Sequence, residues 1–452
     1  MRRTLALAAV ALASLVAAAV AALLRPVLPP EPPEPQGVRA GGLRMTTQLD
    51  RRYLPERGGG EAILQIDLAA DADPSARRRV PVNAVLVLDR SGSMSGPKLD
   101  RARDAARALV QALSDDDRLA IVEFGSEASV LFPSAPMTRE ARPRVLSALE
   151  SLQAMGGTNL SAAFDLAAPE LLRGHAGGRV DKVFLASDGQ ANEGISDRAG
   201  LLRLAQRDCS GATLSTFGMG EDYDEDLLSA LAAQNGGRAR YIASPEVLPG
   251  AFRDELSRAA AAVARDVRVR FEGAAVERVL GYDAPDGNGW VRLPDFAAGE
   301  ERRVLVKLRI PPGRGRAELV RVRLKFDEAA SGAGAEAVAS VQGAYTSETA
   351  LLLLAPTGAA VEGARAEMAE LAQHAAQLQE AGRRDEAAAQ VALLRAVALQ
   401  TARAAPASAA PVMQAASDYA QEVFAIDAPG GAASKALKQK TFDAVRAPVR
   451  GW

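Results

Sequence analysis

The spacing of hydrophobic residues changes along the chain, and each change predicts a different architecture. Between residues 82 and 265, short apolar runs such as Val85–Leu88 alternate with stretches whose apolar residues recur at helical spacing, such as Leu99, Ala102 and Ala106. A short apolar run followed by helical periodicity is typical of a buried parallel strand and its crossover helix. This segment therefore predicts an α/β domain with a doubly wound, mostly parallel sheet covered on both faces.

Other segments alternate apolar and polar residues with a period of two. Val267–Phe271, Val304–Leu308 and Val320–Phe326 show this alternation and are separated by turn residues. Alternation of this kind predicts an antiparallel β-sandwich over residues 266–347. Strand-like segments within residues 41–81 have no partners nearby in the sequence. We therefore expect them to join the sandwich, with the α/β domain inserted between them.

Helical periodicity returns after the predicted sandwich. Residues 355–426 predict an antiparallel helical hairpin, because an alanine-rich apolar stripe is interrupted at Gly382. Residues 427–452 contain a glycine-containing linker at Ala428–Ala433 and a basic stretch after it, so we expect a flexible tail. Lysines such as Lys435 and Lys438 favour a solvated helix face over a contact with the acidic surface of another protein.

The N-terminal segment carries a membrane signal. In residues 1–25, a pair of arginines precedes Thr4–Leu24, a run without charges. About 20 apolar residues are enough to cross a bilayer, so we expect a single-pass anchor with the rest of the chain on the periplasmic or extracellular side. Ala19–Ala21 fits a signal-peptidase site, which leaves secretion after cleavage as an alternative. Residues 26–40 are rich in proline and predict an extended linker.

Composition limits the chemistry. The 452 residues include 48% apolar and 24% charged residues, values of an ordinary soluble protein with several domains. The formal net charge of -2 argues against a nucleic-acid partner, which requires a basic face. Cys209 is the sole cysteine, so no intramolecular disulfide can form, and its apolar neighbours predict a buried, inert thiol. The chain has only two histidines, which disfavours a histidine-based hydrolytic site.

Oxygen-bearing side chains follow the predicted strands of the α/β domain. Asp89, Ser91 and Ser93 come directly after the first apolar run, Asp188 follows a later run, and Thr158 lies in a glycine-containing loop. Because ligands bind at the carboxyl ends of parallel strands, we expect these side chains to converge. Carboxylates and hydroxyls without Cys or His suit a hard cation, Mg²⁺ first, with Mn²⁺ or Ca²⁺ as alternatives. The alternative is that these residues only cap helices.

The same positions resemble a known family. The pattern DxSxS at residues 89–93, the loop around Thr158 and the triplet at residues 187–189 resemble the metal-ion-dependent adhesion site of von Willebrand factor type A (VWA) and integrin I domains. The resemblance covers residues 82–265 and implies a Rossmann-like VWA fold. The phrase at residues 218–223 and the flanking sandwich resemble bacterial envelope members, described as calcium-activated chloride-channel-like after remote relatives.

The resemblance implies a mechanism of binding. Ser91, Ser93 and Thr158 would contact the metal through their hydroxyls, and Asp89 and Asp188 would hold it through water. Because hydroxyls are neutral, the metal would keep affinity for an Asp or Glu carboxylate of a partner protein. We expect a non-enzymatic, adhesion-type binding module on the outer side of the membrane.

Other functions remain open. The first is an envelope structural or assembly factor, in which the sandwich and helices bind and the metal is secondary. A metal-dependent hydrolase would need a general base beside the metal, and the sequence offers no candidate beyond the ligands themselves.

Overall fold

The computed structural model describes residues 36–72, 79–188, 190–220, 223–242, 244–273, 275–282, 285–352, 354, 358–426 and 431–446. The predicted anchor at residues 1–25 and most of the predicted linker lie outside these ranges. Within them, every helix is too short or too polar to span a bilayer.

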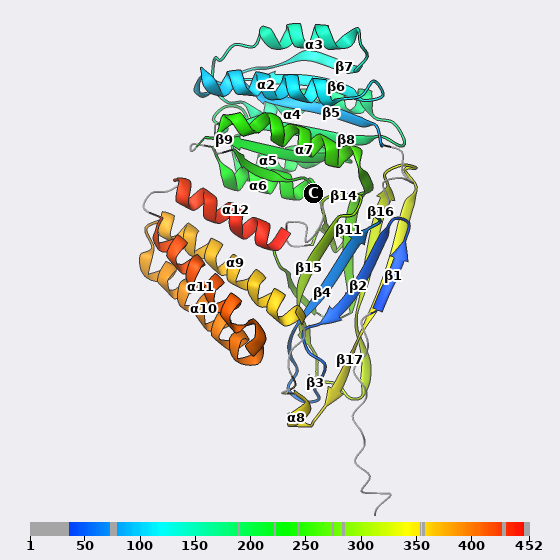
Figure 1. Ribbon diagram of the computed structural model, residues 1–452, viewed down its shortest axis with the longest axis vertical. Helices are drawn as coiled ribbons and strands as arrows, with labels where there is room; N and C mark the ends of the chain where they lie inside the picture. Colours follow the sequence, from blue (N-terminus) through cyan, green and yellow to red (C-terminus); the bar gives the residue numbers. More distant parts are fainter. Residues whose placement is uncertain are drawn as a thin grey trace, which may run out of the picture.

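The α/β unit contains a six-stranded sheet in the order β10-β9-β8-β5-β6-β7 (Figure 1). Neighbouring strands run parallel except for β7, which pairs antiparallel with β6 at the edge. The strands are β5 (Val82–Asp89), β6 (Arg118–Phe124), β7 (Ala128–Pro136), β8 (Val180–Ser187), β9 (Thr213–Met219) and β10 (Ala239–Ile242).

Helices cover both faces of this sheet. Leu86 and Leu88 of β5 pack into the core on one face, and Val85 and Val87 pack into the core on the other. Because both faces are buried, the strand is apolar throughout. The first face is covered by α2 (Pro97–Ala112), α3 (Ala141–Glu150) and α7 (Leu248–Ala260), and the second by α4 (Leu160–Gly174), α5 (Arg198–Asp208) and α6 (Glu225–Gln234). The predicted α/β fold class is confirmed.

Two sheets form the β-sandwich beside the α/β unit, and their inner faces share one apolar core. One sheet has the order β1-β2-β4-β15-β12, with β1 (Gln36–Ala40), β2 (Leu43–Leu49), β4 (Gly60–Ala70), β15 (Glu301–Ile310) and β12 (Ala275–Val279). The other has the order β13-β11-β16-β17-β3, with β13 (Trp290–Arg292), β11 (Ala262–Gly273), β16 (Arg316–Glu328), β17 (Gly334–Thr346) and β3 (Leu54–Pro55); β14 (Phe296–Ala297) pairs with β11.

The pairing of β4 with β15 joins distant parts of the chain. Its register runs from Ala69 opposite Glu301 to Gly60 opposite Ile310. The chain thus begins the sandwich, leaves it to form the α/β unit and returns to complete it.

A helical bundle follows the sandwich after the short helix α8 (Thr349–Leu352). Helices α9 (Gly358–Glu380) and α10 (Arg384–Ala404) form a hairpin, and Gly382 takes a φ of 74° in the turn between them. A conformation with positive φ favours glycine, which explains why the stripe is interrupted there. Helix α11 (Ala409–Phe424) joins them in one core, so the region predicted as a hairpin contains a further helix.

The predicted flexible tail is wrong for residues 432–446. They form helix α12 (Ala432–Arg446), which lies between α6 of the α/β unit and helix α9 of the bundle (Figure 1). Leu437 of α12 is buried in the core of the bundle. The helix therefore connects the C-terminal bundle to the α/β unit.

The lysines of α12 explain the error. Lys435 and Lys438 are both buried. Their partners lie on α6, on α9 and at Tyr223 just before α6. The Lys435 ammonium lies 4.3 Å from the ring centroid of Tyr223, and Lys438 forms ion pairs with Glu225 and Glu380. A basic helix is polar in sequence, yet its charges can be buried where carboxylates and an aromatic face meet them.

Candidate metal centre

The predicted metal ligands lie at the carboxyl ends of two adjacent strands. Asp89 is the last residue of β5, and Asp188 directly follows β8. The two strands pair in parallel register up to Leu88 opposite Ala186, so both carboxylates emerge at the same edge of the sheet. Asp89 and Asp188 are both buried.

Hydrogen bonds connect the serines with Asp188. The Ser93 hydroxyl donates to Asp188 Oδ1 over 2.8 Å, and the hydroxyl oxygens of Ser91 and Ser93 lie 3.0 Å apart. Ser91 is buried, whereas Ser93 is exposed. The structure therefore brings Ser91, Ser93 and Asp188 together in a cluster that opens to solvent at Ser93.

Asp89 is held by donors on both carboxylate oxygens. Its Oδ1 accepts a hydrogen bond from the Ser91 amide over 2.8 Å, and its Oδ2 accepts one from the Ser187 hydroxyl. Burial raises the pKa of Asp89, against the effect of the hydrogen bonds from Ser187 and Ser91. Because both oxygens are engaged, Asp89 suits a role in positioning the cluster and binding a metal through water.

Backbone hydrogen bonds place the Thr158 loop beside this cluster. The Gly92 amide donates to the Gly156 carbonyl over 2.9 Å, and the Met155 amide donates to the Arg90 carbonyl over 2.7 Å. Thr158 itself is buried, and its amide donates to Asn192 Oδ1 over 2.8 Å. The loop that carries Thr158 thus lies between the loop of the serines and the segment after Asp188.

Ser126 and Glu193 brace the Thr158 loop, and the sequence analysis misses both. The Ser126 hydroxyl donates to Glu193 Oε1 over 2.9 Å and accepts the Gly157 amide over 2.8 Å. A Cβ at Gly157 would lie 2.3 Å from Glu193 Oε1, so a side chain at this position requires the carboxylate to move. In the sequence, a serine shortly after β6 and a glycine before Thr158 are each too common to predict that the two residues are in contact.

Lys98 is a further residue that the sequence analysis misses. It lies in the first turn of α2, and its ammonium forms an ion pair with Asp188 Oδ2. The ammonium also lies close to Gly220 after β9. A cation in the first turn of a helix opposes the helix dipole, so a lysine there signals a nearby anionic partner. Asp188 is thus already paired with a positive charge.

The chemistry of the cluster fits a hard cation. In the part of the chain that the structure describes, no group of three or more His, Cys, Asp and Glu side chains converges. Those residues therefore do not form a metal site built from Cys and His side chains or from three or more carboxylates. Hydroxyls with a pair of carboxylates and access to water match the oxygen ligands and partial hydration that Mg²⁺ prefers.

The prediction for the lone cysteine is confirmed. Cys209 is buried at the end of α5, and burial raises the pKa of its thiol to about 12, with a smaller contribution from Asp208. The thiol is therefore protonated and inert at neutral pH.

Comparisons with known proteins agree with this architecture. The family model described as von Willebrand factor type A domain matches residues 83–253. The chain is 30% identical to the uncharacterized protein sll0103 of Synechocystis over 60% of its own length and 67% of that protein. It is 29% identical to the uncharacterized protein YfbK of Escherichia coli over 54% of its own length, which spans 44% of that relative.

A solved structure shares the fold beyond the α/β unit. The von Willebrand factor type A structure from Catenulispora acidiphila superposes with a TM-score of 0.69, covers 94% of this chain and 99% of its own, and is 19% identical. At this identity the likeness shows the fold alone.

Proposed function

Because the chain belongs to the von Willebrand factor type A domain family, we propose that it is a metal-dependent protein-binding module. VWA domains commonly serve as protein-interaction modules and are mostly non-enzymatic. The observation that carries the proposal is the Ser93 hydroxyl, which lies between Ser91 and Asp188 at the carboxyl edge of the sheet.

In this proposal, each residue of the cluster has a role. Ser91, Ser93 and Thr158 would hold Mg²⁺ through their hydroxyls, while Asp89 and Asp188 would hold it through water. Bound magnesium would supply a coordination position for an Asp or Glu carboxylate of a partner protein. The neutral hydroxyls leave that position attractive to an anion, and the exposure of Ser93 leaves it accessible. Asp89 also keeps the Ser91 loop in place through the Ser91 amide.

The proposal places the module on the outer side of the membrane. Its support is the apolar run Thr4–Leu24 behind a pair of arginines. Protease added to intact cells or spheroplasts should then digest residues 36–446 without lysis, and protection until lysis would contradict this location.

A second candidate function rests on the bundle surface. Leu393 and Leu399 of α10 and Met413 and Phe424 of α11 are exposed, with Leu393 at 53% and Phe424 at 50%. Exposed apolar residues favour an envelope structural or assembly factor that binds through its helices, with the metal secondary. Asp89→Ala separates the two functions: loss of partner capture supports the metal-dependent module, and full retention supports the bundle.

Carboxylate capture can be tested without knowing the partner. Mn²⁺ bound to the protein enhances the relaxation of water protons, and a carboxylate that replaces its water lowers this enhancement. We expect acetyl-Gly-Asp-Gly-amide to lower the enhancement and acetyl-Gly-Asn-Gly-amide to leave it unchanged. Asp89→Ala should show little enhancement at all, whereas Glu127→Gln, on an exposed side chain of the loop after β6, should match the wild type. Equal effects of the two peptides would contradict capture of an acidic residue.

A further inference from the structure

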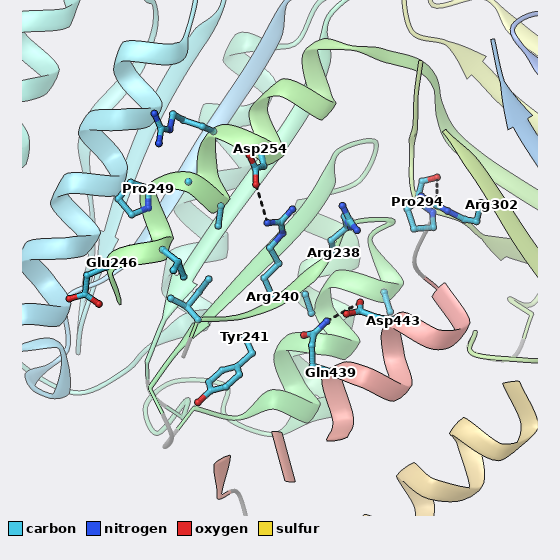
Figure 2. A pocket seen from close by; sticks show the side chains of 18 of the residues that line it. Arg238, Arg240, Tyr241, Glu246, Pro249, Asp254, Pro294, Arg302, Gln439 and Asp443 are labelled. Atoms are coloured by element: carbon cyan, nitrogen blue, oxygen red, sulfur yellow. Dashed lines mark hydrogen bonds and ion pairs between the residues drawn. The ribbon is translucent and has the colours of Figure 1, made fainter. Parts of the chain in front are cut away.

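A cavity of about 700 Å³ lies where the α/β unit, the sandwich and α12 meet (Figure 2). This volume lies within the range of sites that bind small molecules. Its apolar surface includes Ala239, Ile242, Val247, Pro249 and Pro294. The cavity shares no described residue with the candidate metal centre.

Arg238 provides a guanidinium without a directly bonded partner in this cavity. In the described part of the chain, neither a hydrogen bond nor an ion pair engages its guanidinium. Burial lowers the pKa of Arg238, and the nearby Arg258 and Arg240 lower it further, against the opposing effect of Glu255 and Glu300. The carboxylates of Glu255 and Glu300 balance this charge only from a distance, and an anion bound directly to the guanidinium would stabilise it further.

The described acidic residues that line the cavity bind partners other than the Arg238 guanidinium. Arg240 Nη1 forms an ion pair with Asp254 Oδ2 over 3.6 Å, a distance longer than that of a hydrogen bond. Asp443 of α12 accepts a hydrogen bond from Gln439 over 3.0 Å. Figure 2 shows Arg238 and Arg240 reaching from the β10 segment toward the same space, while Asp254 meets Arg240 alone.

Glu246 at the rim also has other partners. It accepts a hydrogen bond from the Ser244 hydroxyl and forms an ion pair with Arg101. Arg302, on the sandwich side, is already bound to Glu300 and to the Pro294 carbonyl. The guanidinium of Arg238 therefore remains without a directly bonded carboxylate among the described residues of the cavity.

We propose that this cavity binds a small organic anion, with its carboxylate or phosphate on Arg238 and Arg240 and its apolar body against Ile242, Pro249 and Pro294. A guanidinium presents parallel N–H donors that match the oxygens of either group, and this favours an anion over a neutral ligand. The apolar wall favours an organic body over an inorganic ion. Binding here does not depend on the metal centre.

Calorimetry on the whole chain with matched probes tests this proposal. Phenyl phosphate and benzoate carry both features, inorganic phosphate lacks the apolar body, and benzyl alcohol lacks the charge. We expect at least one of the two aromatic anions to bind at least about tenfold more tightly than inorganic phosphate and benzyl alcohol. Benzyl alcohol lacks the hydrogen bonds between charged groups, which are stronger than those between neutral groups, and inorganic phosphate lacks the apolar body. Absence of binding by both aromatic anions, or equal binding of benzyl alcohol, would overturn the proposal.

Variants identify the site. Arg238→Gln should weaken binding of the aromatic anion at least about tenfold. Arg395→Gln, an exposed arginine on α10, removes the same charge far from the cavity and should leave the affinity unchanged. If circular dichroism shows that Arg238→Gln does not fold, Arg240→Gln decides: a several-fold loss supports the site, and wild-type affinity overturns it.

Discussion

The docking of α12 on the α/β unit yields the sharpest prediction about stability. The Lys438 ammonium lies 3.0 Å from Glu380 Oε2 and 3.7 Å from Asp226 Oδ1, and it also bonds to Glu225. It thereby joins α12 to both α9 and α6. Lys438→Met keeps the apolar stem of the side chain and removes only this charge.

The magnitude follows from what the carboxylates retain. Only 9% of the Lys438 side chain is exposed, and removing one partner of a buried ion pair costs about 3–5 kcal/mol. After the substitution Glu225 still has Lys435 at 3.8 Å, and Glu380 still has the Ser434 hydroxyl at 2.5 Å. Because neither carboxylate is left alone, we expect the local free energy of opening to fall by about 2–3 kcal/mol.

Lys440 on the same helix is the matched control. Its ammonium lies 2.6 Å from Glu422, but 46% of its side chain is exposed. An exposed ion pair of this kind contributes about 0–1 kcal/mol. Lys440→Met therefore removes the same charge from α12 but only an exposed ion pair and a contact of the ammonium with the Tyr419 ring 5.1 Å away.

Amide hydrogen exchange of α12 measures the difference. Lys438→Met should accelerate exchange in residues 434–441 by about 30- to 150-fold, and Lys440→Met by less than about fivefold. Equal acceleration by the two variants, or none by Lys438→Met, would refute the claim that α12 is held by a buried ion pair.

Three other substitutions have defined outcomes. Lys98→Met should tighten Mg²⁺ binding several-fold in calorimetry, because the Lys98 ammonium no longer competes for Asp188; an unchanged or weaker affinity would count against the site. Burial raises the pKa of the Asp295 carboxyl to about 6. The folded chain therefore binds the carboxyl proton more tightly than the unfolded chain does. The stability that this group contributes falls as pH rises from about 4 to about 6. Asp295→Asn should therefore stabilise the protein by up to about 3 kcal/mol at pH 7.5 and hardly at pH 4 in urea unfolding, and an equal effect at both pH values would reject this cause. Lys182 pairs with buried Glu255 over 2.6 Å, so Lys182→Met should destabilise the protein by about 3 kcal/mol in urea unfolding, and no loss would contradict the pairing.

The strands were predictable where burial alone sets their composition. Val85–Leu88 is apolar throughout because helices cover both of its faces. Strand β7 is not predicted, since it lies at an edge, carries Pro133 and Pro136 and alternates irregularly. Proline is tolerated at an edge because its missing N–H faces away from the ladder.

The residues of the candidate site that lie at the ends of strands were predictable from the sequence. Asp89 and Asp188 follow apolar runs directly, so the topology of a parallel sheet brings them to one edge. Lys98 and Glu193 act through contacts with residues far apart in the sequence, which no local pattern reports. The same holds for Lys435, whose buried ammonium contacts the Tyr223 ring and Glu225.

Magnesium binding is the central claim, and isothermal titration calorimetry tests it directly. The wild type should bind one Mg²⁺ ion per chain, Asp188→Ala should bind none, and Glu127→Gln should bind as the wild type does. No magnesium uptake by the wild type, or uptake that survives Asp188→Ala, would contradict the metal-dependent function.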